Sequence, residues 1–191
     1  NDTFRFDGAQ WTTAGTFFRP DPRFHAAITT DVANGRILLQ GGEENVPNIG
    51  TGFNGFFDVW QWNNGWFPLS AFVNTGAAAL ESQGVTFDPA RNEVVLFSGG
   101  IVASAVGISN QTFTFNGSSF TDEDPVFNMS PTFNSSLAAF RGGVIAIGIN
   151  DTQTFRWSGT NWAVVAGNPP DTIDRPKLVT DLQNDRVVAV G

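Results

Sequence analysis

The side chains that could perform catalysis are few in type. The chain has one histidine, His25, and neither cysteine nor tyrosine. A serine hydrolase would therefore depend on His25 as its general base, and no nucleophile-elbow motif accompanies it. A glycosidase needs only two carboxylates about 5 to 10 Å apart, and 18 acidic residues meet that condition without singling out a pair. We expect the protein not to be an enzyme, with a carboxylate-based glycosidase as the least favoured alternative.

One acidic run could bind a hard cation, because Ca²⁺ prefers clustered oxygen ligands. It comprises Asp122, Glu123 and Asp124. The run lacks the spaced Asp-x-Asp-x-Asp loop with its distal Glu that calcium loops use. A solvated turn is the preferred interpretation, and we predict neither a metal nor a cofactor.

The best candidate for recognition is the segment 43–57, which mixes acids, amides and aromatic rings. Rings stack on the apolar faces of sugars while amides and carboxylates bind hydroxyls, so the mixture suits a glycan or a peptide. The alternative is that the rings fold back over the rim of a sheet. The predicted ligand-binding residues are Glu43, Glu44, Asn45, Phe53, Asn54 and Phe56.

Two kinds of segment, each present four times, must position these residues. An apolar hairpin with a polar turn occurs at 25–42, 82–100, 134–150 and 175–191. An aromatic hairpin occurs at 2–11, 58–66, 111–120 and 153–162, with the form Thr or Val, aromatic, any residue, aromatic, a glycine-containing turn and a further aromatic. Each apolar hairpin followed by an aromatic one predicts a four-stranded antiparallel sheet.

Recurring residues within the hairpins predict local roles. Aspartates at the start of three turns are expected to cap those turns: Asp31, Asp88 and Asp181. Aromatic residues two apart share one face of a strand and form a packing ledge. Tryptophans at matching strand positions therefore predict core packing rather than a carbohydrate platform: Trp60, Trp62, Trp157 and Trp162.

Double glycines follow two of the apolar strands, at Gly41-Gly42 and Gly99-Gly100, and the first pair is followed by a loop and Asp-x-Trp-x-Trp-x-x-Gly-Trp. This pattern resembles the kelch repeat, as in the middle domain of galactose oxidase, and the likeness covers essentially the whole chain. The third and fourth copies keep only Gly148 and Gly191, and Phe replaces the usual Tyr or the position is lost. The resemblance implies a β-propeller, but the copper site of that oxidase needs two His, two Tyr and a Cys, which this chain does not have.

The fold prediction is all-β: a four-bladed kelch-type β-propeller of four-stranded antiparallel blades, closed by pairing of the N- and C-terminal hairpins. We predict a single domain, 1–191, with blades at about 25–66, 82–120, 134–162 and at 175–191 plus 2–11. A fragment of a larger propeller is the alternative. Aligning the repeats places four polar residues near the start of the innermost strands, where they would line a central channel holding water or a small ligand: His25, Ser82, Asn134 and Arg175.

Charge and glycosylation motifs bear on partners and location. A net charge of −8 without a basic stripe predicts no nucleic-acid partner. The absence of a long apolar run predicts no membrane insertion, and the amino terminus shows no leader. An excess of Asn-x-Ser/Thr motifs favours a secreted, extracellular glycoprotein over a chain merely rich in these residues. The candidate glycosylation sites are Asn1, Asn110, Asn116 and Asn150.

Two functions remain. The first is a non-catalytic extracellular binding module that presents its long-loop face to a glycan or protein partner. The second is a structural building block that self-assembles into an extracellular coat or fibre through its surface aromatics.

Overall fold

A computed structural model describes most of the chain as strands and turns, with no helix in the described part. The described residues are 2–15, 17–45, 53–56, 58–69, 80–101, 107–126, 134–148, 152–165, 167, 169 and 171–191. A search of these residues for a helix long and apolar enough to cross a membrane finds none.

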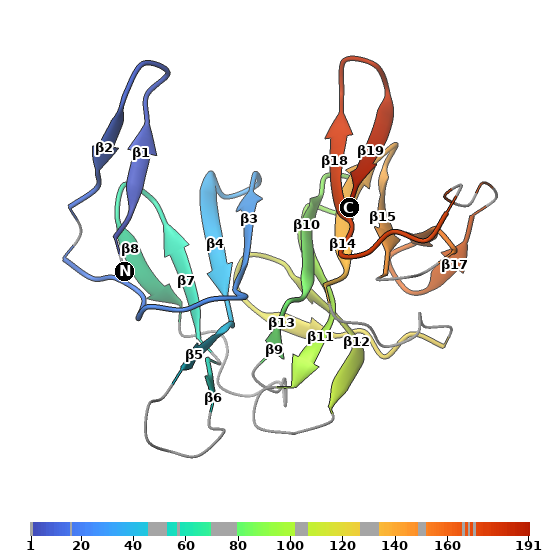
Figure 1. Cartoon of the computed structure of the whole chain (residues 1–191), viewed down its shortest axis with the longest axis horizontal. Coiled ribbons are helices and arrows are strands. Elements are labelled where there is room, and N and C mark those ends of the chain that lie inside the picture. Colours follow the sequence, from blue (N-terminus) through green and yellow to red (C-terminus); the bar gives the residue numbers. More distant parts are fainter. Residues whose placement is uncertain are drawn as a thin grey trace.

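Three antiparallel sheets, two of four strands and one of five, follow one another along the chain (Figure 1). The first sheet contains β3 (Ala27–Asp31), β4 (Arg36–Gln40), β7 (Val59–Trp62) and β8 (Trp66–Leu69). The second contains β10 (Gly84–Asp88), β11 (Glu93–Ile101), β12 (Ile108–Phe115) and β13 (Phe120–Asp122), and the short β9 (Leu80–Glu81) pairs with β11. The third contains β14 (Ser136–Phe140), β15 (Gly143–Ile147), β16 (Phe155–Trp157) and β17 (Trp162–Val164). Each predicted union of an apolar and an aromatic hairpin is thus confirmed in these three sheets.

The two terminal hairpins differ from the prediction. β1 (Phe4–Phe6) pairs only with β2 (Trp11–Thr13), and β18 (Lys177–Asp181) pairs only with β19 (Arg186–Val190) among the described strands. Figure 1 shows the two hairpins apart, with β1–β2 at the upper left and β18–β19 above β14. The predicted closure by pairing of the N- and C-terminal hairpins is therefore wrong for this structure.

Each terminal hairpin is joined to its own neighbouring sheet. The indole N–H of Trp66, in the first sheet, donates to the Thr3 hydroxyl at 2.8 Å. At the other end, the Leu178 N–H donates to the Ser136 hydroxyl at 2.8 Å. Three complete sheets and two separate half-sheets result.

The first strands of the apolar hairpins lie side by side, since β3 contacts β10, β10 contacts β14, and β14 contacts β18. The residues predicted to begin these strands all have left-handed backbones, with φ of 57°, 55°, 54° and 50° at His25, Ser82, Asn134 and Arg175. Non-glycine residues rarely adopt this conformation. Its recurrence at four aligned positions confirms the repeat alignment at the level of the backbone.

The core lies between successive sheets. One cluster joins the first and second sheets and contains Leu38, Val59, Phe87, Val94, Leu96, Phe113, Phe115 and Phe120. The other joins the second and third sheets and contains Val95, Phe97, Leu137, Val144, Ala146, Phe155, Trp157 and Trp162. The predicted core role of Trp157 and Trp162 is confirmed, whereas Trp60 and Trp62 are only half-buried.

The predicted turn caps are also present. Asp31 accepts a hydrogen bond from the Arg36 guanidinium at 2.8 Å, and Asp88 accepts one from the Ala90 N–H at 3.0 Å. Asp181 accepts one from the Asn184 amide at 2.8 Å. The aspartate carboxylate therefore organises each of these turns from within.

Neighbouring sheets share two repeated contacts. A guanidinium from the apolar hairpin of one sheet binds a carbonyl in the glycine turn of the aromatic hairpin of the following sheet. Arg36 reaches the Gly117 oxygen at 2.6 Å, and Arg91 reaches the Ser158 oxygen. An indole N–H also donates to a threonine hydroxyl in the preceding sheet, from Trp162 to Thr112 at 2.8 Å. The Trp66–Thr3 bond repeats this second contact, so β1–β2 occupies the place of the outer half of a sheet that precedes the first.

Candidate functional site

The segment predicted to recognise a ligand contains a short hairpin that sequence reasoning treated as an irregular loop. β5 (Glu43–Asn45) and β6 (Phe53–Gly55) pair antiparallel, with Glu44 opposite Asn54. Figure 1 shows this hairpin at the lower edge of the molecule, whereas the turns of β1–β2, β3–β4 and β18–β19 point to the upper edge. The pairing brings five of the six predicted binding residues together on one small ribbon.

An ion pair between a buried Arg23 and a partly exposed Asp58 anchors the base of this ribbon. The Arg23 side chain is 5% exposed. Its guanidinium binds the Asp58 carboxylate through two hydrogen bonds of 2.5 and 2.9 Å, and the Gly41 carbonyl at 3.0 Å. The Trp60 indole N–H donates to the same carboxylate at 2.6 Å. Burial alone would raise the pKa of Asp58, but the hydrogen bonds from Arg23 and Trp60 outweigh it and hold the pKa below its ordinary value.

Phe56, the sixth predicted binding residue, packs against this anchor. The Arg23 guanidinium lies 3.9 Å from the centre of the Phe56 ring, a cation–π arrangement. The Phe56 N–H also donates to the Gly42 carbonyl at 2.9 Å. For Phe56, the contacts fit the alternative interpretation, in which the ring folds back on the rim of the sheet.

His25 and Glu43, which were assigned to two different predicted sites, form one pair. His25 Nδ1 lies 3.0 Å from Glu43 Oε1, and the imidazole is 52% exposed while the Glu43 side chain is 7% exposed. The Phe24 ring lies edge-on to the imidazole, with centroids 4.9 Å apart. Backbone hydrogen bonds of 3.0 Å run both ways between Phe24 and Glu43. The half-exposed imidazole and the hairpin therefore belong to a single surface.

Each of the other predicted channel residues lies just before the first strand of its own apolar hairpin. The Ser82 N–H donates to the His25 carbonyl at 2.9 Å, so these two are neighbours. Asn134 and Arg175 each lie two residues before a strand, β14 and β18 respectively, in the same backbone conformation. A role for the four residues in binding a channel ligand stays a prediction.

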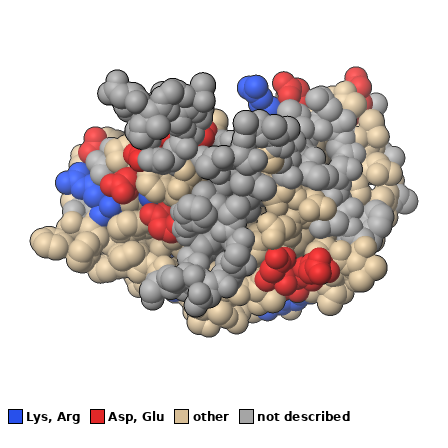
Figure 2. Space-filling model, turned by 90° about the horizontal axis from the view of Figure 1, so that it is seen from below, with Lys and Arg blue, Asp and Glu red and all other residues tan. Residues whose placement is uncertain are grey.

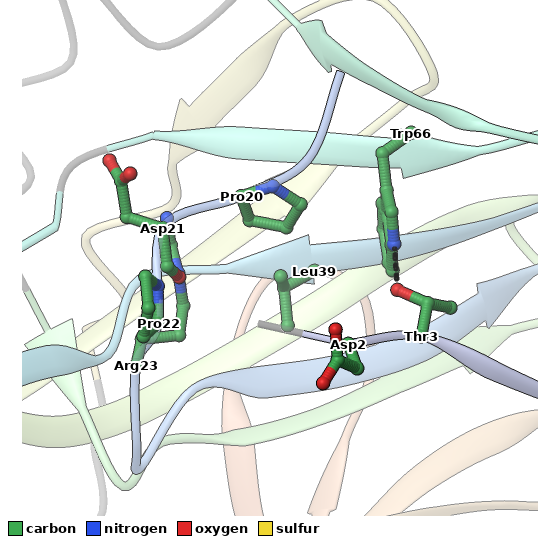
Figure 3. Close-up of a pocket in the computed structure, with 8 residues that line it drawn as sticks. All are labelled: Asp2, Thr3, Pro20, Asp21, Pro22, Arg23, Leu39 and Trp66. Atoms are coloured by element: carbon green, nitrogen blue, oxygen red, sulfur yellow. Dashed lines mark hydrogen bonds between the residues drawn. The ribbon is translucent and has the colours of Figure 1, made fainter. Parts of the chain in front are cut away.

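A small cavity flanks the anchor (Figure 3). It has a volume of about 160 Å³ and lies between Arg23, Trp66 and the N-terminal residues Asp2 and Thr3. Pockets for small-molecule ligands usually measure about 300 to 1,000 Å³. A ligand larger than a single small group would therefore have to lie across the surface rather than inside this cavity.

Figure 2 views the molecule from the side on which β5–β6 lies and shows separate groups of acidic side chains there, with a few basic ones beside them. No three side chains of His, Asp or Glu converge as metal ligands anywhere in the described ranges. Two of the candidate glycosylation residues, Asn110 and Asn116, are exposed. The other two, Asn1 and Asn150, lie outside the described residues.

Sequence reasoning missed one carboxylate group. Burial raises the pKa of Glu93 above its ordinary value, and the nearby carboxylates of Glu123 and Asp88 raise it further. The Thr114 hydroxyl donates to Glu123. The register of β10–β11, in which Glu93 lies opposite Asp88, could have predicted the proximity of those two residues from the hairpin pattern.

Comparison with known proteins shows the fold and no family. No protein-family model matches the chain, and no curated protein matches it. Among solved structures, the chain is similar to the structure of YjhT, with a TM-score of 0.70 at 14% sequence identity. The similarity covers 99% of this chain and 65% of the YjhT chain, so this chain spans less than two thirds of that structure. It supports the all-β arrangement of successive antiparallel sheets.

Proposed function

We propose that this chain is a secreted, non-catalytic binding module of the kelch-propeller type, which recognises a glycan or protein partner through the surface of β5–β6 and His25. The observation that carries the proposal is the anchored ribbon. A hairpin that stands out from the sheets is fixed at its base by the Arg23–Asp58 pair, in which the Arg23 side chain is buried. Recognition residues held on a rigid support lose little entropy when a ligand binds.

The chemistry of the ribbon favours a hydroxyl-rich ligand. Glu44 and Asn54 are paired in the backbone register of the ribbon, and their residue types supply a carboxylate and an amide. The His25 imidazole adds a third polar group, half-exposed and oriented by Glu43. Such groups form hydrogen bonds with sugar hydroxyls or with a peptide backbone.

The test is binding of the purified protein to a glycan array, followed by calorimetry with the best glycan found. Glu44→Ala and Asn54→Ala should each weaken binding roughly tenfold, because a hydrogen bond to a charged or polar group contributes about 1 to 2 kcal/mol. Asp124→Ala, an exposed acidic residue outside the ribbon, is the matched control and should bind as the wild type does. Equal binding by all variants would place the site elsewhere.

Secretion and glycosylation belong to the same proposal. Mass measurement of the native protein before and after enzymatic deglycosylation should show a loss of glycan mass. Asn116→Gln should remove part of that mass if this exposed turn residue carries a glycan. An unmodified native mass would contradict secretion through a glycosylating pathway.

A structural building block is the second candidate, and exposed apolar residues on both terminal hairpins favour it. Concentration-dependent assembly in light scattering would support it. A carboxylate-based glycosidase ranks third. The raised pKa of Glu93 beside Glu123 makes Glu93→Gln the variant that tests it. Hydrolysis of glycosides by the wild type but not by this variant would favour catalysis over binding.

A further inference from the structure

The N-terminal aromatic hairpin exposes rings whose counterparts in the second sheet are buried. Its matching residues in the second sheet have the same strand positions and the same facing direction by the repeat pattern. The exposed fractions are 57%, 54% and 69% for Phe4, Phe6 and Trp11, against 3%, 1% and 8% for Phe113, Phe115 and Phe120. Rings of this size contribute most to stability when they are covered, so β1–β2 presents a surface suited to a partner.

The C-terminal hairpin has the complementary feature. In the complete sheets, the second strand of each apolar hairpin pairs with the first strand of the aromatic hairpin: β4 with β7, β11 with β12, and β15 with β16. Among the described strands, none pairs with the corresponding edge of β19. Val179 and Val190 on this hairpin are largely exposed. An open strand edge beside apolar side chains readily accepts another strand.

The complete sheets give the register that such a strand would take. Ile37 lies opposite Trp62, Val94 opposite Phe115, and Val144 opposite Trp157. In each pair, the second residue of the second apolar strand lies opposite the second aromatic residue of the aromatic hairpin. Applied to the terminal hairpins, this rule places Val187 opposite Phe6, Val188 opposite Arg5, and Ala189 opposite Phe4.

Two cavities lie on the face of the first sheet that corresponds to the face of the second sheet covered by β3–β4. One, of about 380 Å³, is lined by β1 together with Ile28, Ile37 and Trp62. The other, of about 320 Å³, also includes Ile37 and Trp62 and extends to the turn residue Asn64. At the joint of the first and second sheets, the matching surface is covered by Leu38, the counterpart of Val188. Both cavities therefore lie where β18–β19 would lie if it preceded the first sheet.

We propose that the hairpin β18–β19 of one molecule docks beside β1–β2 of a second copy, with β19 pairing to β1 in this register. A second copy is the occupant we propose because the repeats give β19 and β1 complementary edges in one register, while within one molecule these two strands are separate and do not pair. The contact joins two different surfaces, so it is head-to-tail and builds rings or fibres.

Two further contacts follow from the repeats. The Trp11 indole of the second copy would donate to the Thr154 hydroxyl of the molecule that supplies β18–β19. Trp162 makes the same bond to Thr112 within one chain. The Gly8 turn of the second copy would meet the turn of the third sheet, where Arg141 is exposed and already pairs with Asp185. The proposal does not depend on ligand binding by β5–β6.

Disulfide trapping tests the register, because the chain has no native cysteine. Arg5→Cys and Val188→Cys are made as separate variants, mixed and oxidised mildly. Paired positions in adjacent strands have the Cα separation that a disulfide needs. We expect a covalent dimer in the mixture and little in either variant alone. Val187→Cys mixed with Arg5→Cys is the register control and should form no dimer, since its side chain faces the other side of the strand.

The double variant Arg5→Cys/Val188→Cys, oxidised at low concentration, distinguishes pairing of β1 with β19 of the same chain from pairing with β19 of a second copy. A disulfide within a single chain would show closure by the same molecule and would overturn the proposal. Absence of any cross-link in the mixture would overturn it as well. In light scattering, Phe6→Asp should weaken concentration-dependent association about tenfold or more. Val126→Asp, an equally apolar exposed site at 98% exposure, should leave association unchanged. Glycan binding by Phe6→Asp should persist.

Discussion

The second sheet and the N-terminal hairpin carry the same aromatic pattern, yet one is core and the other is surface. Phe115 lies under the first sheet with Val94 beside it, whereas Phe6 has no apolar hairpin paired to its strand in the described structure. Their local geometry is otherwise alike, since Gly117 and Gly8 in the two turns share a φ of 101°. The comparison teaches that the pattern specifies a hairpin, while burial depends on which hairpin pairs with it.

The largest contrast is expected when the second aromatic is removed from each hairpin. Phe115→Ala should lower the free energy of unfolding by about 4 kcal/mol, because it leaves a cavity in the core. Phe6→Ala should lower it by about 1 kcal/mol or less, because its ring is already half exposed. Urea denaturation of dilute protein measures both. Equal losses would mean that β1–β2 is covered in solution.

Removing the turn aspartates should give the next largest contrast. Asp88→Ala should cost about 3 kcal/mol, since it deletes a fully buried carboxylate that holds Arg91 at 2.7 Å and the Ala90 N–H. The counterpart Asp181→Ala, in the exposed C-terminal hairpin, should change global unfolding far less. Thermal unfolding of the two variants measures both losses of stability. A larger loss of stability for Asp181→Ala would contradict the expected difference between the second sheet and the C-terminal hairpin.

The glycine turns test the joint between sheets. Both Gly117 and Gly8 adopt a φ that disfavours any other residue, so each change to alanine should cost about 1 to 2 kcal/mol. At Gly117 a Cβ would also lie 2.6 Å from the Asn34 amide, whereas at Gly8 it would meet nothing within 4 Å. Gly117→Ala should therefore cost about 1 kcal/mol more than Gly8→Ala. Guanidinium unfolding curves decide this, and identical midpoints would mean that the Asn34 side chain moves aside freely.

The smallest expected effect is acid loosening of the N-terminal turn. The N–H groups of Gln10 and Ala9 hold the pKa of Asp7 below its ordinary value. A folded-state pKa that is lowered stabilises the turn above the unfolded pKa of about 4, and this contribution is lost as pH falls through the folded value. Amide protection in β1–β2 should thus decline at the acid end. Asp7→Asn should abolish this dependence, because Asn116 caps the matching turn without a charge.

Much of the fold could be predicted from sequence because the repeats reinforce one another. The pairing within the three complete sheets, the aspartate caps and the equivalence of His25 with Ser82 all follow from local pattern. The pairing of β5 with β6 did not, since a glycine-rich segment of acids and amides carries no strand alternation. The contact of His25 with Glu43 was missed because His25 was assigned to a repeated hairpin and Glu43 to a loop outside the repeats.

By itself, the amino-acid sequence determined the hairpins, their order and their turns, because these depend on side-chain alternation and on backbone angles within a few residues. Only the tertiary structure decided which sheet each terminal hairpin joins, where the Arg23–Asp58 anchor forms, and which aromatic rings remain exposed. Those outcomes depend on contacts between residues far apart in the chain, and identical local patterns at Phe6 and Phe115 give no information about the surfaces that cover them.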